Sequence, residues 1–138
     1  MKNSIVNYIS WALQILIALI YLQTLYFKFS AHPDSVYIFS TLGLEPYGRI
    51  GIGIFELITS ILILLPQTRI YGGILSVGVI LGAILAHLGP LGIVVHNDGG
   101  KVFYLALTVL IASLLFLWLN RNDVLRIYHQ FKQKISPK

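Results

Sequence analysis

Residues 48–66 of the chain read GRIGIGIFELITSILILLP, and this stretch decides the fold. The sixteen residues between Arg49 and Pro66 are nearly all apolar, and a carboxylate, Glu56, lies among them. A helix needs about 17 to 25 residues to cross a hydrocarbon core roughly 30 Å thick. The stretch therefore predicts a membrane-spanning helix that begins before Arg49, which Pro46 permits because proline suits the first helical turn.

The remaining sequence is equally apolar. Hydrophobic residues make up 57% of the 138 residues and charged residues 11%, and the mean hydropathy is +0.80. This composition leaves too little polar surface to cover a water-soluble globule. We predict an all-α four-transmembrane-helix bundle in residues 1–119, followed by a tail in residues 120–138. The predicted spans lie near residues 5–27, 48–65, 70–88 and 102–119.

The first apolar run is predicted to stay in the protein as a span. It is too long for the apolar part of a signal peptide, and no small-x-small cleavage site follows it. Only Lys2 charges the segment before it.

The basic residues predict the orientation. Seven of them fall on one side of the four spans: Lys2, Arg69, Arg121, Arg126, Lys132, Lys134 and Lys138. Three fall on the other side: Lys28, Arg49 and Lys101. Because cytoplasmic loops are enriched in Lys and Arg, we expect both termini in the cytoplasm. The net charge of +5 is thus interpreted as an orientation signal, and no nucleic-acid partner is inferred from it.

Two connections flank the spans on the predicted periplasmic side. Residues 33–35, PDS, can open a short helix and Gly43 can close it, which predicts an interfacial helix with Tyr37 at headgroup level. The glycine-rich connection of residues 89–101 predicts no regular element. We expect its apolar residues, Ile93, Val94 and Val95, to fold back against the bundle.

The tail is predicted to form a basic amphipathic helix. Asn120 and Asp123 can cap it, and its apolar residues recur at helical spacing: Val124, Tyr128, Phe131 and Ile135. Such a helix suits the cytoplasmic headgroup region of the lipid bilayer, and a docking handle for another protein is the alternative.

The third span carries small residues four positions apart, namely Gly78, Gly82 and Ala86. Small residues at this spacing let two helices approach closely. We favour packing within the bundle, and a homodimer through this stripe is the alternative.

Glu56 and its neighbours are the candidate site. A charge at the bilayer centre costs about 2.5 to 3.5 kcal/mol, so Glu56 is expected to face the bundle. Helical periodicity gives the second span one polar side, and the other spans offer partners for it. The candidate ligand-binding residues are Tyr21, Thr24, Lys28, Arg49, Glu56, His87 and Tyr104.

Three roles for this set remain open. Glu56 can pair with Lys28 and fix helix packing. The residues can line a pocket for a quinone, a lipid headgroup or a small amphiphile. A proton relay through Glu56 and His87 needs a cytoplasmic exit, and the inner halves of the helices offer little for one beyond Gln14 and Ser76.

The sequence contains no motif for metal binding or for thiol chemistry. The spacing of His87, His96 and Asp98 matches no zinc or diiron motif, so no metal is assigned. The chain has no cysteine, which excludes thiol catalysis by its own residues. We assign no catalytic residue.

Four short motifs resemble those of the DoxX family of small four-helix membrane proteins. They are FKF at 27–29, G-x-E-P-x-G-R at 43–49, FEL at 55–57 with an aliphatic run to Pro66, and AHL at 86–88. The resemblance covers roughly residues 22–119. It implies a bacterial inner-membrane protein in a family of uneven function. Some members are associated with thiosulfate oxidation and quinone reduction, others with oxidoreductase complexes, and a eukaryotic relative with receptor assembly.

The resemblance maps onto Lys28, Glu56 and His87, and no established catalytic role transfers with them. The absence of cysteine departs from the branches linked to thiol metabolism. We expect a non-catalytic binding or assembly subunit with a polar pocket open to the periplasm. The alternative is a quinone-interacting subunit of an oxidoreductase complex, with quinone as its cofactor. The chain has no flavin, haem or iron–sulfur motif with which to pass electrons alone.

Overall fold

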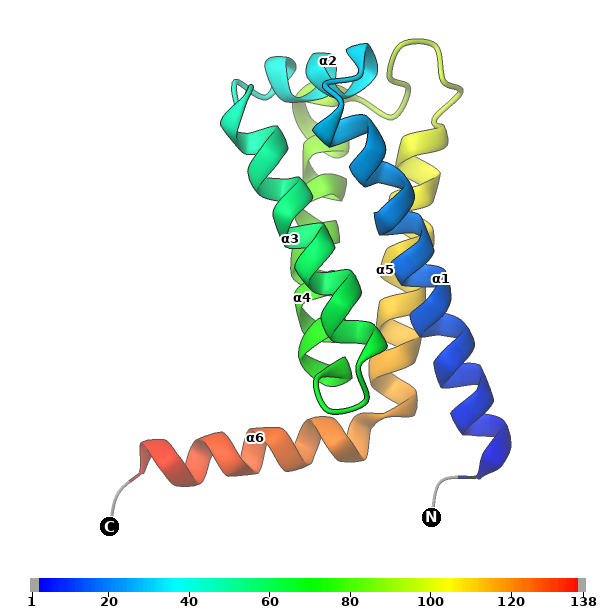
Figure 1. Ribbon diagram of the computed structural model, residues 1–138, viewed down its shortest axis with the longest axis vertical. Helices are drawn as coiled ribbons and strands as arrows, with labels where there is room; N and C mark the ends of the chain where they lie inside the picture. The colour runs from blue at the N-terminus through cyan, green and yellow to red at the C-terminus, as the bar shows by residue number, and fades with distance from the viewer. Residues whose placement is uncertain (1–2, 137–138) are drawn as a thin grey trace.

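The computed structural model describes residues 3–136, and they form an all-α bundle without strands. The four long helices are α1 (Ser4–Phe29), α3 (Tyr47–Leu64), α4 (Arg69–Ala86) and α5 (Lys101–Leu119). The short helix α2 (Pro33–Thr41) lies across one end of the bundle, and α6 (Arg121–Ile135) leaves the other end sideways (Figure 1). The predicted fold class is confirmed. Lys2 and Lys138, which enter the orientation argument, lie outside the described residues.

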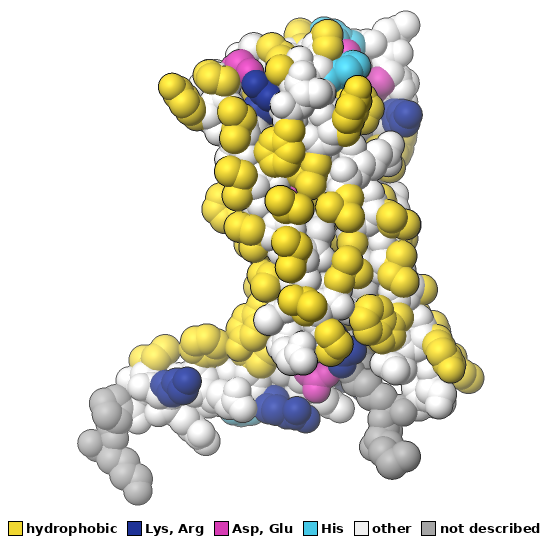
Figure 2. Space-filling view, viewed as in Figure 1, with side chains coloured by type: hydrophobic (Ala, Val, Ile, Leu, Met, Phe, Trp, Pro, Cys, Tyr) yellow, Lys and Arg dark blue, Asp and Glu magenta, His cyan; other side chains and the backbone are white. Residues whose placement is uncertain are grey.

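Each long helix is long and apolar enough to cross a membrane. The third apolar segment runs from Arg69 to Leu91, because a π-helical turn, η1 (His87–Leu91), continues α4. Large hydrophobic side chains cover the flank of the bundle, and the charged side chains on the visible face gather at its two ends (Figure 2). This surface is that of a multi-pass membrane protein in contact with lipid.

The four long helices pack in a ring. Helix α1 packs on α3 and α5, and α4 packs on the same two helices. Large apolar side chains from three of the helices fill the centre and are less than 2% exposed: Ile17, Ile63, Val109 and Phe116. Because lipid is as apolar as these side chains, they hold the helices together by close packing rather than by leaving water.

Helix α2 begins and ends where the sequence predicts. Pro33 is its first residue, and the ring nitrogen Nδ1 of His32 accepts a hydrogen bond from the backbone N–H of Asp34 at 3.3 Å. Gly43 follows the helix with φ +69°, a conformation that glycine adopts without strain. Phe39 is buried against the bundle, whereas Tyr37 is 41% exposed.

The small residues of α4 do not all serve the same purpose. A Cβ at Gly72 would lie 2.4 Å from the backbone nitrogen of Ile63, so this glycine allows α3 and α4 to approach closely. A Cβ at Gly78 or Gly82 would meet nothing within 4 Å, and both positions are exposed. The favoured interpretation of the stripe at Gly78, Gly82 and Ala86 as packing within the bundle is therefore wrong for the two glycines, which face outward, whereas Ala86 is half-buried.

The connection after α4 is more ordered than predicted. It begins with the η1 turn, in which Pro90 lacks a backbone N–H and Gly89 departs from helical geometry. Only Val95 folds back, at 3% exposed; Ile93 and Val94 are 45% and 54% exposed, so the expectation for these two is wrong.

Candidate functional site

Glu56 lies on the inward side of α3 and is 6% exposed. The buried residues of this helix recur at steps of three and four: Arg49, Gly53, Glu56, Thr59, Ser60 and Ile63. The predicted polar side of the second span is thus the side that packs in the bundle. Protein, rather than acyl chains, surrounds the carboxylate.

The Glu56 carboxylate is held by α1. Its Oε2 lies 2.9 Å from Nζ of Lys28 and accepts a hydrogen bond of 2.9 Å from the hydroxyl of Thr24. The side chains of Lys28 and Glu56 are 13% and 8% exposed. An ion pair that is shielded from water stabilises the fold only while both partners are present. If one partner is removed, the other charge stays buried without compensation.

A second ion pair adjoins the first. The Arg49 guanidinium bonds both carboxylate oxygens of Glu45 through Nε at 2.9 Å and one of them through Nη2 at 2.8 Å. Its Nη1 donates to the carbonyl of Lys28, which lies in the last turn of α1 and has no partner within the helix. We name Thr24, Lys28, Glu45, Arg49 and Glu56 the Glu56 cluster; it ties the end of α1 to α3.

Tyr21 belongs to a separate polar layer nearer the centre of the bundle. Its hydroxyl lies 3.1 Å from both the carbonyl and the hydroxyl of Ser76. The Ser76 hydroxyl in turn lies 2.8 Å from that of Ser113. This layer joins α1, α4 and α5, and the sequence analysis did not identify Ser113 because a lone serine in an apolar helix carries no signal of its own.

A third polar layer lies near the α6 end. The Asn120 amide nitrogen donates to the Ser10 hydroxyl at 2.9 Å and to the Phe116 carbonyl at 2.7 Å. The Gln14 amide nitrogen donates to the carbonyl of Ser10 at 3.0 Å. The Gln14 oxygen, Oε1, is buried without a hydrogen-bond partner.

The other two candidate residues lie apart from the Glu56 cluster. His87 is 3% exposed, its Nδ1 lies 2.8 Å from the Gly92 carbonyl, and its ring packs edge-on to Phe103. It therefore organises the connection that follows α4. Tyr104 is 59% exposed, because burial of the adjacent Phe103 turns the next position about 100° away from the core.

Asp98 stabilises the connection before α5. Partial burial of its carboxylate opposes ionisation, but the backbone N–H groups of Val95, Val102 and Gly100 donate to it, and His87 adds a favourable charge. The net result, in which His87 counts only as a neighbour that acts in the same direction as these N–H groups, is that the pKa of Asp98 lies below its ordinary value.

His96 joins that connection to α2. Its Nδ1 lies 2.9 Å from Oδ1 of Asp34, and its ring packs on Tyr37 with the centroids 3.9 Å apart. Within residues 3–136, no three His, Asp or Glu side chains come together in a way that could hold a metal ion.

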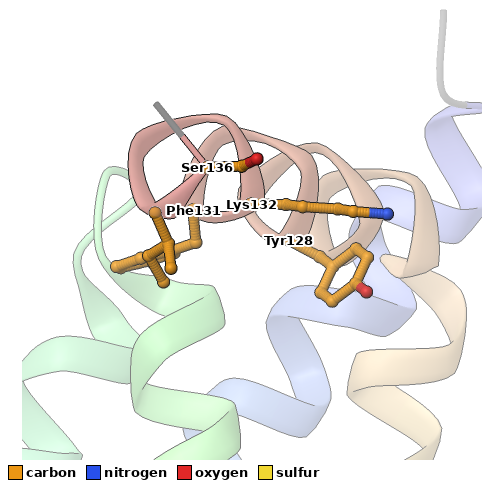
Figure 3. A pocket seen from close by; sticks show the side chains of 5 residues that line it. Tyr128, Phe131, Lys132 and Ser136 are labelled. Carbon is orange, nitrogen blue, oxygen red and sulfur yellow. The ribbon is translucent and has the colours of Figure 1, made fainter. Parts of the chain in front are cut away.

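A hollow of about 300 Å³ borders α6 at the opposite end from Glu56. It is lined by Tyr128, Phe131, Lys132, Ile135 and Ser136, whose side chains Figure 3 shows along the helix. The lining is mostly apolar, with one ammonium group at the edge.

The geometry gives the Glu56 cluster a clear chemical character. Each of its two carboxylates has a cation, Lys28 for Glu56 and Arg49 for Glu45, and α1 is joined to α3 by the first pair and by the bond from Arg49 to the Lys28 carbonyl. Comparisons of the chain with protein-family models, with curated proteins and with solved structures give no match.

Proposed function

We propose that the chain is a DoxX-like protein of the bacterial inner membrane that acts as a non-catalytic binding or assembly subunit. The motifs that carry the resemblance support this proposal, because their charged residues contact one another. Lys28 comes from FKF, Glu45 and Arg49 from G-x-E-P-x-G-R, and Glu56 from FEL. In this proposal the motifs build one tie between α1 and α3.

The observation that carries the proposal is the engagement of Glu56. Its Oε2 is already bound by Lys28 and Thr24, and the residue is 6% exposed. A Glu56 that served a quinone would have to do so through its other oxygen, Oε1, because Lys28 and Thr24 already hold Oε2. The pair serves packing better than chemistry, and this favours binding over catalysis.

The proposed orientation places the α6 end in the cytoplasm and the α2 end in the periplasm. Five described basic residues belong to the α6 end: Arg69, Arg121, Arg126, Lys132 and Lys134. Three belong to the α2 end, Lys28, Arg49 and Lys101, so the excess of Lys and Arg lies at the α6 end. The binding face in this proposal is the α2 end, close to the Glu56 cluster.

Purified protein in lipid nanodiscs tests the proposal against the quinone alternative. A ligand at one hundred times its Kd stabilises a protein by about 2.7 kcal/mol, which a melting curve detects. We expect ubiquinone and menaquinone to leave Tm unchanged and organic extracts of the purified protein to contain no quinone. We also expect a bound lipid or partner polypeptide to remain with the protein at fixed stoichiometry.

The matched variant is Glu56→Gln. A saturable rise in Tm with quinone that Glu56→Gln abolishes would assign the site to a quinone and overturn the proposal. Protein that carries neither lipid nor partner and shows no shift would contradict a binding role.

A further inference from the structure

Helix α6 is fixed to the bundle only by its first turns. Val124 and Ile127 pack against the core, and the Arg69 guanidinium lies 3.3 Å from the carboxylate of Asp123. Beyond these contacts the helix runs away from the bundle, roughly across the direction of the long helices (Figure 1). About two turns at its end therefore present their side chains freely.

These free turns are apolar on one side. Tyr128, Phe131 and Ile135 are 58%, 51% and 77% exposed, and they line the 300 Å³ hollow. Figure 2 shows hydrophobic side chains along the edge of α6 that faces the same way as the bundle, with basic side chains on the opposite edge. The apolar edge of α6 thus lies at the end of the bundle's apolar flank and faces the same layer as that flank.

The charges of α6 complete the pattern. At about 100° per residue, Lys132 and Lys134 lie on opposite sides of the line through Tyr128, Phe131 and Ile135, about 65° and about 95° from it. Lysines at the borders of an apolar stripe can bury their stems and reach outward with their ammonium groups. The one acid of the helix, Asp123, lies beside both Arg69 and Arg126, so it does not offset the two lysines.

We propose that α6 lies in the headgroup layer of the membrane and selects anionic phospholipids. Its apolar residues enter the acyl boundary, and Lys132 and Lys134 bind the lipid phosphates. An amphipathic helix with a basic polar side binds such a layer through buried apolar area together with attraction to anionic lipid. A soluble protein partner fits less well, because the apolar edge points toward the membrane level and away from water.

The absence of cysteine makes the test direct, since one introduced cysteine can carry one spin label. Phe131→Cys places the label on the apolar edge, and Gln133→Cys places it on the opposite side. Each variant of the full chain is reconstituted in vesicles of phosphatidylcholine alone or mixed equally with phosphatidylglycerol. Accessibility to oxygen and to a water-soluble nickel chelate then reports whether the label lies in lipid or in water.

We expect the label at 131 to lie in lipid and the label at 133 in water, with the contrast greatest in anionic vesicles. Lys132→Gln and Lys134→Gln are expected to lower the ratio of inserted to exposed label about fivefold each in anionic vesicles. Lys101→Gln, which removes the same charge at the other end of the bundle, is the matched control and is expected to change nothing.

Labels at 131 and 133 that are equally accessible to the nickel chelate would overturn the proposal and leave α6 as a handle for a protein. If the ratio of inserted to exposed label at 131 is the same in both kinds of vesicle and is unchanged by the lysine substitutions, the proposed selection of anionic lipid is overturned. Circular dichroism of each variant separates these outcomes from unfolding of the helix.

Discussion

Single polar side chains inside the bundle are tolerated because nearly all of them have partners. Burying a polar group without a hydrogen bond costs about 1 to 3 kcal/mol in proteins. Glu56, Tyr21 and Asn120 each contact a polar group on another helix. Gln14 is different, because its Oε1 is buried without a partner while its amide nitrogen bonds only within α1.

Gln14 and Asn120 therefore respond differently to replacement by leucine. Gln14→Leu removes an unpaired acceptor together with a bond inside one helix, so we expect a loss of less than about 1 kcal/mol of unfolding free energy, or a gain. Asn120→Leu removes a bond between α5 and α1 and is expected to cost about 1 to 2 kcal/mol. Denaturation in mixed micelles measures both. An equal or larger loss for Gln14→Leu would mean that its oxygen is bound after all.

The sequence predicts the residues that surround Glu56 but not the polar contacts farther along the bundle. Helical periodicity places Thr24 and Lys28 on one face of the first span, and it places Glu56 on the polar face of the second span. Both faces are expected to point into the bundle. Periodicity does not predict that Phe103 is buried while Tyr104 is exposed, because both residues are aromatic and α5 is apolar all round. The polar partners Ser113 and Asn120 become visible only when helices far apart in sequence are packed.

The packing of α4 against α3 depends on how closely the two backbones can approach each other. A Cβ at Gly72 would lie within 3 Å of backbone atoms of α3, which cannot move aside as a side chain can. Gly78 faces open space on the same helix. The sequence gives no means of ranking these two glycines, because spacing alone does not say which face of α4 meets α3.

The pair Gly72→Ala and Gly78→Ala tests this difference on one helix. Alanine favours a helix over glycine by about 1 kcal/mol in either position. We expect Gly78→Ala to stabilise the protein by about 0.5 to 1 kcal/mol and Gly72→Ala to destabilise it by about 1 to 3 kcal/mol through overpacking. Thermal unfolding of the two variants side by side is the measurement. A stabilised Gly72→Ala would show that α3 and α4 are not in close contact there.

Helix boundaries are predictable where capping residues mark them and less so elsewhere. Pro33 and Gly43 bound α2 as expected. Helix α6 begins directly after Asn120, but the expected side-chain cap is absent there, because the Asn120 amide donates to Ser10 and Phe116 instead. The η1 turn carries no comparable sequence signal, because Gly89 and Pro90 usually end a helix instead of continuing it with another hydrogen-bond pattern.

The bundle as a whole has an uneven distribution of charge that predicts its orientation. Asn97 lies at the α2 end and Gln133 at the α6 end, and both are exposed. In intact bacterial cells we expect a membrane-impermeant maleimide to label Asn97→Cys, and to label Gln133→Cys only after the inner membrane is opened. Periplasmic labelling of Gln133→Cys would reverse the proposed orientation.

The Lys28–Glu56 ion pair also holds the bundle together near its α2 end, and this pair underlies the proposed function. Removing one partner of a buried ion pair costs about 3 to 5 kcal/mol, largely because the other charge is left alone. Thr24→Val, which removes only the hydroxyl bond to Glu56, is expected to cost about 0.5 to 1 kcal/mol and serves as the control.

A double-mutant cycle on Lys28 and Glu56 is the most direct test of this account. The unfolding free energies of Lys28→Met, Glu56→Leu and the double variant are measured in mixed micelles. We predict that each single variant loses about 3 to 5 kcal/mol and that the double variant loses less than the sum by at least about 1.5 kcal/mol. Losses that simply add would show that Glu56 is not held by Lys28, and the ion pair would have to be abandoned as part of the tie between α1 and α3.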